Sequence, residues 1–296
     1  MLYKSHLQKE FFMALFSWRA LKDFLHAQLC YQYFITPLPL PLEKAHRGFA
    51  RIACEFLSFN RTNIIHGSTP RHYVIHHFAA KPNARKILIT HGWMSRAAYM
   101  ARLIWKLQQA GYEIYALDFP AHGEARGFQV TWLESAAVLR QILNEFGPFY
   151  GVIGHSYGGA MLLNTFHLAQ QLPAWRLDCI PQKAVFLAAP MTLKTPISGV
   201  ARYFKLSGRA FSRFKCAVKK HSQAHLKYLN SRQFMHASDM PILCVHGEDD
   251  TTILPDESKH FCRHYPHASL TLLPKVNHVN ILIDERIEKI VHDFLH

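Results

Sequence analysis

Long apolar segments are missing from this sequence. No window of about twenty consecutive residues is apolar enough for a membrane-spanning helix, so none is expected. A secretory signal needs a longer uninterrupted apolar core than Phe11 to Phe16, and the charged residues Arg19 and Lys22 follow that run too soon. We therefore expect the chain to work in the cytoplasm.

Patterns typical of metal sites and disulfide frameworks are also absent. The six cysteines lie far apart with no CxxC pair, which argues against a zinc site and favours free thiols in a reducing compartment. The 21 histidines form neither an HExxH motif nor an HxH cluster. No motif for an organic cofactor is visible either, so we expect neither a metal nor a cofactor.

Acidic residues are scarce relative to basic ones. The sequence has 34 lysines and arginines and 20 aspartates and glutamates, which gives a formal net charge of +14 at pH 7. Such a charge suits nucleic acid, an anionic membrane surface or an acidic substrate. Basic residues are spread along the whole chain, so charge alone does not choose among these partners. We expect no nucleic-acid partner, and a peripheral contact with an anionic membrane stays open.

Residues 1–45 are predicted to form an amphipathic helical segment followed by a proline-rich tether. Prolines alternate with leucines from Pro37 to Leu42, a composition typical of an extended linker that lays the helix across the main body. The helix either docks on the protein's own body or anchors on anionic lipid, and we favour docking. Its apolar residues at helical spacing are Leu7, Phe11, Leu15, Trp18, Leu21, Leu25 and Leu29.

The rest of the chain has the pattern of a mostly parallel sheet. Two strands are expected at 53–59 and 71–79, as the antiparallel edge of a mixed sheet. From Lys86 onward, short apolar strands alternate with longer helical segments, which is typical of right-handed β-α-β crossovers. This alternation predicts one α/β core made of residues 46–190 and 241–296. The expected strands are 87–90, 112–117, 150–153, 183–188, 241–247 and 269–273, and the expected helices are 97–109, 131–146, 159–172, 255–264 and 280–295.

Residues 191–240 interrupt the alternation and are rich in lysine, arginine and aromatic residues. We interpret them as a helical cap inserted over the strand ends, where the site of an open α/β sheet lies. The cap would select substrates with an apolar acyl part. Phe204, Phe211 and Phe214 are expected to line the pocket, while the long basic side chains keep their charged heads in water. Whether those charges also attract an anionic substrate or only solvate the cap stays open.

The segment Gly154-His155-Ser156-Tyr157-Gly158 has G-x-S-x-G spacing between an apolar strand and an apolar-periodic helix. This context makes the motif informative, because the sharp turn strains the serine backbone and lifts its hydroxyl clear of the sheet. Gly154 and Gly158 are expected because the backbones on either side of the serine approach closely and leave no room for a Cβ atom. The following helix directs free N–H groups and its positive dipole end at an oxyanion. Ser156 is therefore the candidate nucleophile.

A serine hydroxyl needs a base to take its proton and a carboxylate to orient that base. Two loops after later strands supply both groups: Asp249 and Asp250 follow Gly247, and His278 precedes the last helix. The order serine, acid, histidine is the one expected on this pattern of strands. We take His278 as the candidate base and Asp250 as the candidate acid, with Asp249 as the alternative.

With these motifs in register, the chain resembles the α/β-hydrolase fold serine hydrolases over roughly residues 70–296, with a cap insertion. The family usually carries its acid in a GxxD segment, and the resemblance implies that Asp250, three residues after Gly247, is that acid. The family's histidine usually follows a glycine, and here Asn277 stands in that place before His278. The fold implied is a mostly parallel central sheet flanked by helices.

The resemblance also implies an oxyanion hole. The family's donors are the backbone N–H of the residue after the nucleophile, which is Tyr157, and that of the residue after a His-Gly pair, which is Trp93. The segment 118–123 is similar to the family's DxPGHG loop, with Ala121 in place of a glycine. The residues expected to shape the elbow and the site are Gly154, His155, Gly158, His91 and Gly92.

This constellation implies two-step acyl transfer on a small-molecule acyl substrate, and the expected reaction is carboxylic ester hydrolysis. Thioesterases, acyltransferases and carbon–carbon bond hydrolases use the same residues and differ in pocket shape, so these activities stay open. The alternative from a different class is a non-catalytic module that binds a membrane surface or nucleic acid.

Overall fold

The computed structural model describes residues 2–38, 44–222 and 239–296, with side chains from residue 18 onward in the first helix and from residue 47 onward in the second. An eight-stranded sheet with the order β1-β2-β4-β3-β5-β6-β7-β8 forms the core of this part. β2 pairs antiparallel with β1 and with β4, and the remaining neighbours are parallel. The strands are β1 Asn63–Gly67, β2 Tyr73–Phe78, β3 Lys86–Thr90, β4 Glu113–Asp118, β5 Gly151–His155, β6 Lys183–Leu187, β7 Ile242–Gly247 and β8 Ala268–Leu273.

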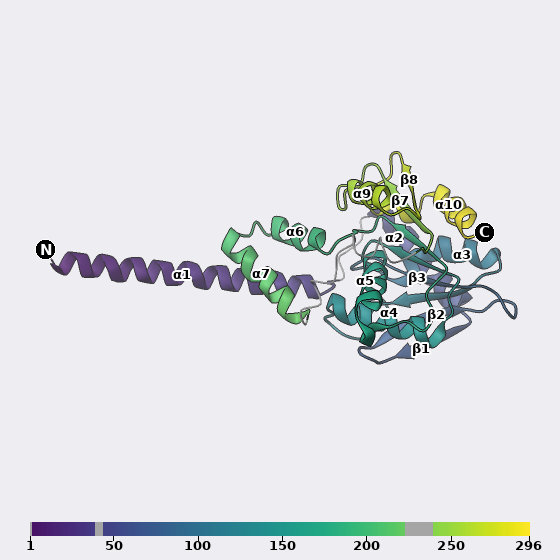
Figure 1. The fold of residues 1–296 in the computed structure, drawn as a ribbon, viewed down its shortest axis with the longest axis horizontal. Helices are drawn as coiled ribbons and strands as arrows, with labels where there is room; N and C mark the ends of the chain where they lie inside the picture. The colour runs from purple at the N-terminus through teal and green to yellow at the C-terminus, as the bar shows by residue number, and fades with distance from the viewer. Residues whose placement is uncertain (1, 39–43, 223–238) are drawn as a thin grey trace.

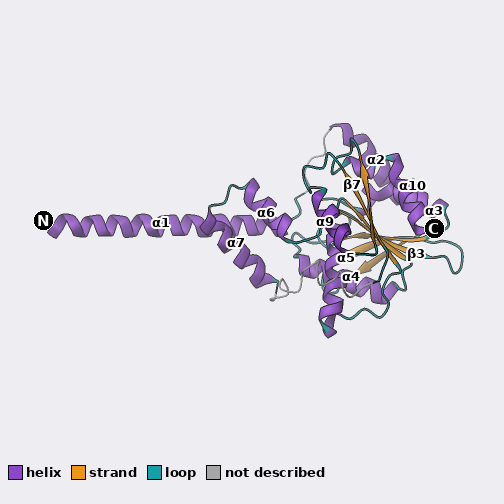
Figure 2. Ribbon diagram, turned by 45° about the horizontal axis from the view of Figure 1, so that its top comes forward, coloured by secondary structure: helices purple, strands orange, loops and turns teal. Residues whose placement is uncertain are grey.

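Helices cover both faces of this twisted sheet (Figure 2). Neighbouring strand residues point to opposite faces, so Val152 of β5 packs into one apolar cluster and Ile153 into the other. One face carries α4 (Trp132–Phe146), α5 (Tyr157–Gln171) and α9 (Asp256–His264). The other face carries α2 (Lys44–Asn60), α3 (Ala101–Gln109) and α10 (Glu285–Leu295). Elsewhere in the chain, short 3-10 turns lie at Ala97–Met100, Pro173–Trp175 and Asn280–Leu282. The predicted α/β-hydrolase fold, with its mostly parallel sheet and flanking helices, is confirmed.

The strand predicted at 53–59 is wrong, because these residues belong to helix α2. The buried side chains of this helix, Ala50, Ala53 and Leu57, are spaced three and four residues apart and lie on one helical face. The second predicted strand, 71–79, contains β2, and its antiparallel partner is β1 rather than the segment at 53–59. The mixed sheet therefore has the predicted antiparallel edge, with β1 in place of the strand predicted at 53–59.

Helix α1 (Leu2–Ile35) extends away from the sheet and does not lie across it (Figure 1). Its C-terminal part packs on the two cap helices, and the chain joins the core where the Val130 N–H donates to the Ile35 carbonyl at 2.9 Å. The prediction that the helix lies across the main body is therefore wrong. Residues 39–43 of the predicted tether lie outside the described residues.

Two helices, α6 (Lys194–Tyr203) and α7 (Gly208–His221), occupy the predicted cap, and residues 223–238 lie outside the described part of the chain. The expectation that Phe204, Phe211 and Phe214 line the pocket is wrong, because none of them lies among the residues that line the cavity beside Ser156. Phe204 packs edge-on against Tyr33 and Phe214 against Phe34, so these rings hold α1 to the cap. Among the described helices, none combines the length and the apolar character that crossing a membrane requires.

Candidate active site

Ser156 lies at the sharp turn between β5 and α5 (Gly151–His155 and Tyr157–Gln171). Its backbone has φ 48° and ψ −115°, a conformation that a residue with a side chain rarely adopts. The turn is held by the Ser156 N–H, which donates to the Leu187 carbonyl of β6 at 2.8 Å. The predicted strand–turn–helix context of the motif is present.

The glycines beside the serine allow the turn to close. A Cβ atom on Gly154 would collide with the backbone of Gly159, and one on Gly158 would lie 2.7 Å from the carbonyl oxygen of His91. Steric exclusion was the predicted reason for both glycines, and it holds. As predicted, a Cβ atom on Gly154 would also lie 2.8 Å from the backbone of Gly158, whereas one on Gly158 would meet the segment of Thr90 and His91 instead.

The structure brings Ser156, His278 and Asp250 together from three loops. His278 Nε2 lies 2.9 Å from Ser156 Oγ, and His278 Nδ1 lies 2.7 Å from Asp250 Oδ2. Nδ1–H donates to the carboxylate, which leaves Nε2 to accept a hydrogen bond from the serine hydroxyl. All three residues lie at carboxyl ends of strands or in the loops that follow them, as the sequence pattern predicts.

Asp250 is buried and held on several sides. The N–H groups of Thr252 and Ile253 both donate to its Oδ1 at 2.9 Å, and His246 Nε2 lies 3.2 Å from its Oδ2. Burial alone would raise the pKa of Asp250, but the hydrogen bonds from His246, His278 and the backbone outweigh it and hold the pKa well below its usual range. The carboxylate is therefore ionised and fixed in orientation, whereas Asp249 is exposed.

His246 is a part of the site that sequence reasoning missed. It is fully buried at the end of β7, where Nδ1 lies 2.8 Å from Ser258 Oγ and Nε2 lies 2.9 Å from the Ile253 carbonyl. The ring thereby supports both the Asp250 carboxylate and the loop that carries it. A polar residue inside an otherwise apolar strand, Ile242–Gly247, was the signal that could have found it.

His155 supports His278 from the other side. Its Nε2 lies 3.1 Å from the His278 carbonyl, so Nε2–H donates there, and the two rings are 5.2 Å apart. Burial, together with the nearby His278, lowers the pKa of His155 to about 3. His155 is therefore neutral at pH 7 and positions the His278 backbone through a hydrogen bond rather than a charge.

The two amides of the expected oxyanion hole lie beside the serine. Tyr157 is the first residue of α5, and Trp93 follows Gly92, on which a Cβ atom would lie 3.3 Å from Ser156 Cβ. Within the described part of the chain, neither the Trp93 nor the Tyr157 N–H has a hydrogen-bond acceptor. Both groups are therefore free to donate to an atom bound at Ser156.

A family model described as the alpha/beta hydrolase family matches residues 87–292, well over half of the chain. The chain belongs to the alpha/beta hydrolase family. No curated protein sequence matches it.

Solved structures with a similar fold include two esterases. One, from Pyrococcus furiosus, is 21% identical with a TM-score of 0.58, over 88% of this chain and 96% of that one. The other, from a Rhodococcus species, is 16% identical with a TM-score of 0.56, over 80% of this chain and 98% of that one. At these identities the likeness establishes the fold alone.

A second buried network of this hydrolase holds the loop that carries Trp93. Asp118, at the end of β4, accepts hydrogen bonds from the Ala97 N–H at 2.6 Å and the Glu124 N–H at 2.8 Å, and His76 Nε2 lies 3.0 Å from it. Burial would raise the pKa of Asp118, but the His76 hydrogen bond and nearby charges lower it below its usual value. The carboxylate thus ties β2 and two loops to the floor of the site.

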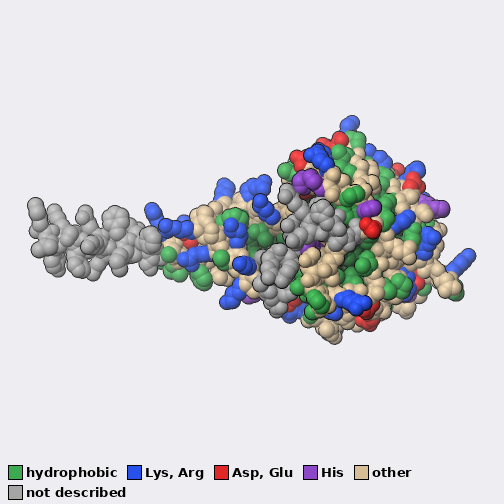
Figure 3. Space-filling view, in the orientation of Figure 1, with side chains coloured by type: hydrophobic (Ala, Val, Ile, Leu, Met, Phe, Trp, Pro, Cys, Tyr) green, Lys and Arg blue, Asp and Glu red, His purple; other side chains and the backbone are tan. Residues whose placement is uncertain are grey.

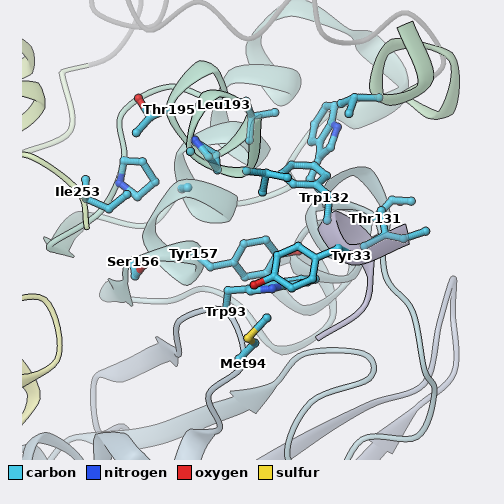
Figure 4. A pocket seen from close by; sticks show the side chains of 18 of the residues that line it. Tyr33, Trp93, Met94, Thr131, Trp132, Ser156, Tyr157, Leu193, Thr195 and Ile253 are labelled. Carbon is cyan, nitrogen blue, oxygen red and sulfur yellow. The ribbon is translucent and has the colours of Figure 1, made fainter. Parts of the chain in front are cut away.

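A cavity of about 630 Å³ opens over Ser156. Its walls come from the core, the cap and the end of α1, and they are mostly apolar. Figure 4 shows Ser156 and Ile253 on one side and Tyr33, Thr131 and Trp132 on the other. The cap contributes Leu193, Val200, Tyr203 and Val218, and α1 contributes Tyr31, Tyr33, Phe34 and Ile35.

The participation of α1 in this cavity was not predicted from the sequence, which treated residues 1–45 as a separate segment. Among the residues that line the cavity, Arg202 is the only lysine or arginine within the described ranges. No group of three or more His, Cys, Asp or Glu side chains in the described residues could hold a metal ion. The alpha/beta hydrolase therefore offers a mostly apolar cavity with Ser156 in its lining, and His278 and Asp250 follow that serine in a chain of contacts.

Proposed function

We propose that this alpha/beta hydrolase cleaves carboxylic esters with an apolar acyl part. Ser156 is the nucleophile, His278 is the base, and Asp250 is the carboxylate that orients the base. The observation that carries the proposal is the chain of contacts from Asp250 Oδ2 through His278 to Ser156 Oγ, 2.7 Å and 2.9 Å long, at the floor of the apolar cavity. A base within hydrogen-bond reach of a hydroxyl, itself oriented by a carboxylate, is the arrangement that activates serine.

In the acylation step, Ser156 Oγ attacks the carbonyl carbon of the ester while His278 Nε2 takes the hydroxyl proton. Asp250 stays ionised and stabilises the imidazolium that forms. The Trp93 and Tyr157 N–H groups donate to the oxyanion. The tetrahedral intermediate then collapses: the ester C–O bond breaks, and His278 gives its proton to the leaving alkoxide, which departs as the alcohol.

Deacylation repeats these roles with water. His278 Nε2 takes a proton from the water as its oxygen attacks the acyl carbon, and the bond between that carbon and Ser156 Oγ breaks. The proton returns to Oγ, and the carboxylic acid leaves. The low pKa of Asp250 supports this cycle, because the carboxylate remains ionised whenever the imidazole gains its proton.

The class of substrate follows from the cavity walls. An acyl chain buried against side chains such as Leu193, Val200 and Trp132 gains about 0.8 kcal/mol for each buried CH₂ group. A volume of about 630 Å³ is in the range of pockets that enclose most of a small ligand. We therefore expect medium or long acyl chains to be preferred over acetyl.

A fluorophosphonate probe tests the proposal, because it reacts with an activated serine and forms a covalent adduct. Wild type should be labelled and should hydrolyse p-nitrophenyl esters, whereas Ser156→Ala should lose labelling and about three or more decades of kcat. Ser212, on the exposed surface of the cap, gives a matched control, and Ser212→Ala should behave as wild type. Labelling that survives in Ser156→Ala would refute the nucleophile, and a wild type that is neither labelled nor active would favour a binding module.

A further inference from the structure

Helix α1 has two apolar faces, and only one of them is covered. The covered face packs on the cap helices, where Ala27, Cys30 and Tyr31 are buried in one cluster with Phe214 and Val218. A single apolar face is all that a surface helix of a globular protein needs for docking. The second face therefore calls for a separate explanation.

The second face is formed by Trp18, Leu21, Leu25 and Leu29, which we call the outer stripe. These side chains are exposed by 69%, 47%, 52% and 67%, respectively. Their spacing of three, four and four residues places them on one side of the helix, about opposite Ala27. They line a shallow groove together with Lys22 and His26. The prediction that this apolar row is the docked face is wrong for its four described members.

The part of the molecule that carries the outer stripe is strongly basic. The described side chains of α1 and the described cap, residues 18–38 and 191–222, contain ten lysines and arginines and one aspartate, Asp23, so their formal charge is 10 − 1 = +9 of the chain's +14. All ten basic side chains are exposed. Figure 3 shows lysine and arginine side chains gathered on this part of the molecule with few carboxylates among them.

The charge decides which occupant fits the stripe. A second copy of the chain would bring two surfaces of the same sign together, and like charges across an interface oppose association. An anionic membrane surface complements the charge and also takes up apolar side chains at its boundary. Tryptophan, as at Trp18, is favoured at that boundary because its ring is apolar with one polar N–H.

The position of α1 also links this surface to the cavity. The helix begins far from the sheet and carries the outer stripe between residues 18 and 29. Its last residues, Tyr33, Phe34 and Ile35, line the cavity over Ser156. Arg213 of α7 lies over the ring of Phe24 at 5.9 Å, so basic cap residues reach the same helix. A helix whose outer stripe lies on a membrane would hold the cap on its opposite side, roughly 10 Å from the lipid surface, where the basic charge still attracts anionic headgroups at low salt.

We propose that the outer stripe of α1, with the basic side chains beside it, binds the surface of an anionic lipid membrane without crossing it. The apolar side chains enter the boundary between headgroups and acyl chains, and the lysines and arginines of α1 and the cap attract the anionic headgroups. This binding does not depend on Ser156, so it stands or falls separately from the proposed esterase activity.

Vesicle co-sedimentation of the full-length chain tests the proposal. Wild type should sediment with vesicles of phosphatidylcholine and phosphatidylserine and much less with phosphatidylcholine alone. The bound fraction should fall with salt, because the Debye length shrinks from about 10 Å at 0.1 M to about 3 Å at 1 M. Trp18→Ser/Leu25→Ser/Leu29→Ser should weaken binding at least tenfold, since it removes the apolar anchors.

The matched control removes exposed apolar side chains elsewhere. Trp105 and Ile180 are exposed by 50% and 63% on the core, so Trp105→Ser/Ile180→Ser should bind vesicles as wild type does. Brominated lipids add a positional readout, because they quench the fluorescence of a tryptophan that enters the acyl region. Quenching should occur in wild type and be largely lost in Trp18→Phe, which keeps an apolar ring.

Two results would overturn the proposal. One is vesicle binding that is unchanged in the triple outer-stripe variant. The other is a wild-type dimer, detected by light scattering without lipid, that becomes a monomer in this variant, because the stripe would then be occupied by a second copy.

Discussion

Asp249 and Asp250 are neighbouring carboxylates with opposite surroundings. Asp250 is 2% exposed and receives hydrogen bonds from His278 and two backbone N–H groups, whereas Asp249 is exposed. Asp250→Asn would present an amide where His278 Nδ1–H needs an acceptor, so the imidazole would be held in the wrong tautomer. We expect kcat to fall by roughly three to four decades in Asp250→Asn and to change less than about threefold in Asp249→Asn.

Pre-steady-state acylation with a p-nitrophenyl ester measures this difference on the chemical step itself. Circular dichroism should show that both variants keep the fold, because each substitution preserves the size of the side chain. Equal losses in the two variants would remove Asp250 from its proposed role.

Single residues differ in how far the sequence could predict them. Ser156 and His278 were predictable because a strained turn and an imidazole after a late strand leave a local pattern in the chain. His246 was not, because its role depends on burial beside Asp250 and Ser258, which only the packed loops bring together. The choice between Asp249 and Asp250 rested on a resemblance in spacing, and burial now supplies a physical reason for it.

Elements show the same division between local pattern and packing. The alternation of apolar strands and helices predicted most of the sheet, because buried parallel strands are short apolar runs. Helix α2 was missed at 53–59, where aromatic and apolar residues suggested a strand although Ala50, Ala53 and Leu57 follow a helical period. On α1, both faces are apolar, so periodicity could not tell which one packs on the cap.

Helix α6 of the cap offers a test of the cavity. Gly199 lines the cavity, and a Cβ atom built on it meets no atom within 4 Å. Gly199→Leu should therefore be accepted by the fold, while its side chain takes up space that an acyl chain would fill. We expect kcat/KM for long-chain p-nitrophenyl esters to fall at least about tenfold relative to short-chain esters, because each CH₂ group that loses its buried position forfeits about 0.8 kcal/mol.

Gly208 provides the matched control at the start of α7. It also has no atom within 4 Å of a built Cβ, and it does not line the cavity. Gly208→Leu should leave the chain-length profile unchanged. A profile that is the same in Gly199→Leu and wild type would show that acyl chains do not run along α6.

The whole molecule combines a core that the sequence predicted with an extension that it did not. The order and direction of the strands follow from short-range patterns and from the handedness of crossovers. The position of α1 depends on contacts between residues far apart in the chain, such as the hydrogen bond from Ser207 Oγ to Asp23 at 2.7 Å and that from Gln129 to Gln32 at 2.6 Å. No local pattern announces such contacts, although they decide where the charge and the exposed apolar surface lie.

Buried histidines make the stability of the whole molecule depend on pH. Burial lowers the pKa of His122 and of His155 to about 3 and that of His167 to about 4, whereas an unfolded histidine titrates near pH 6.5. Below about pH 6.5 the unfolded chain therefore binds protons that the folded chain does not. The free energy of unfolding must fall as the pH is lowered from about 6.5 toward 4, and this loss is absent at higher pH.

His167 on α5 allows this effect to be measured apart from the site. It is buried, and within the described residues its Nε2 has no hydrogen-bond partner. A shift to a pKa of about 4 accounts for up to about 2 kcal/mol of stability lost between about pH 7.5 and about pH 5. We expect His167→Leu, which removes the titrating group and keeps an apolar side chain, to reduce that loss by a similar amount in urea unfolding at the two pH values. The variant should retain esterase activity at about pH 7.5, and this control would show that it is folded. A loss of stability that is as large in His167→Leu as in wild type would mean that His167 titrates alike in the folded and unfolded chain, and the acid sensitivity would then have to come from other groups.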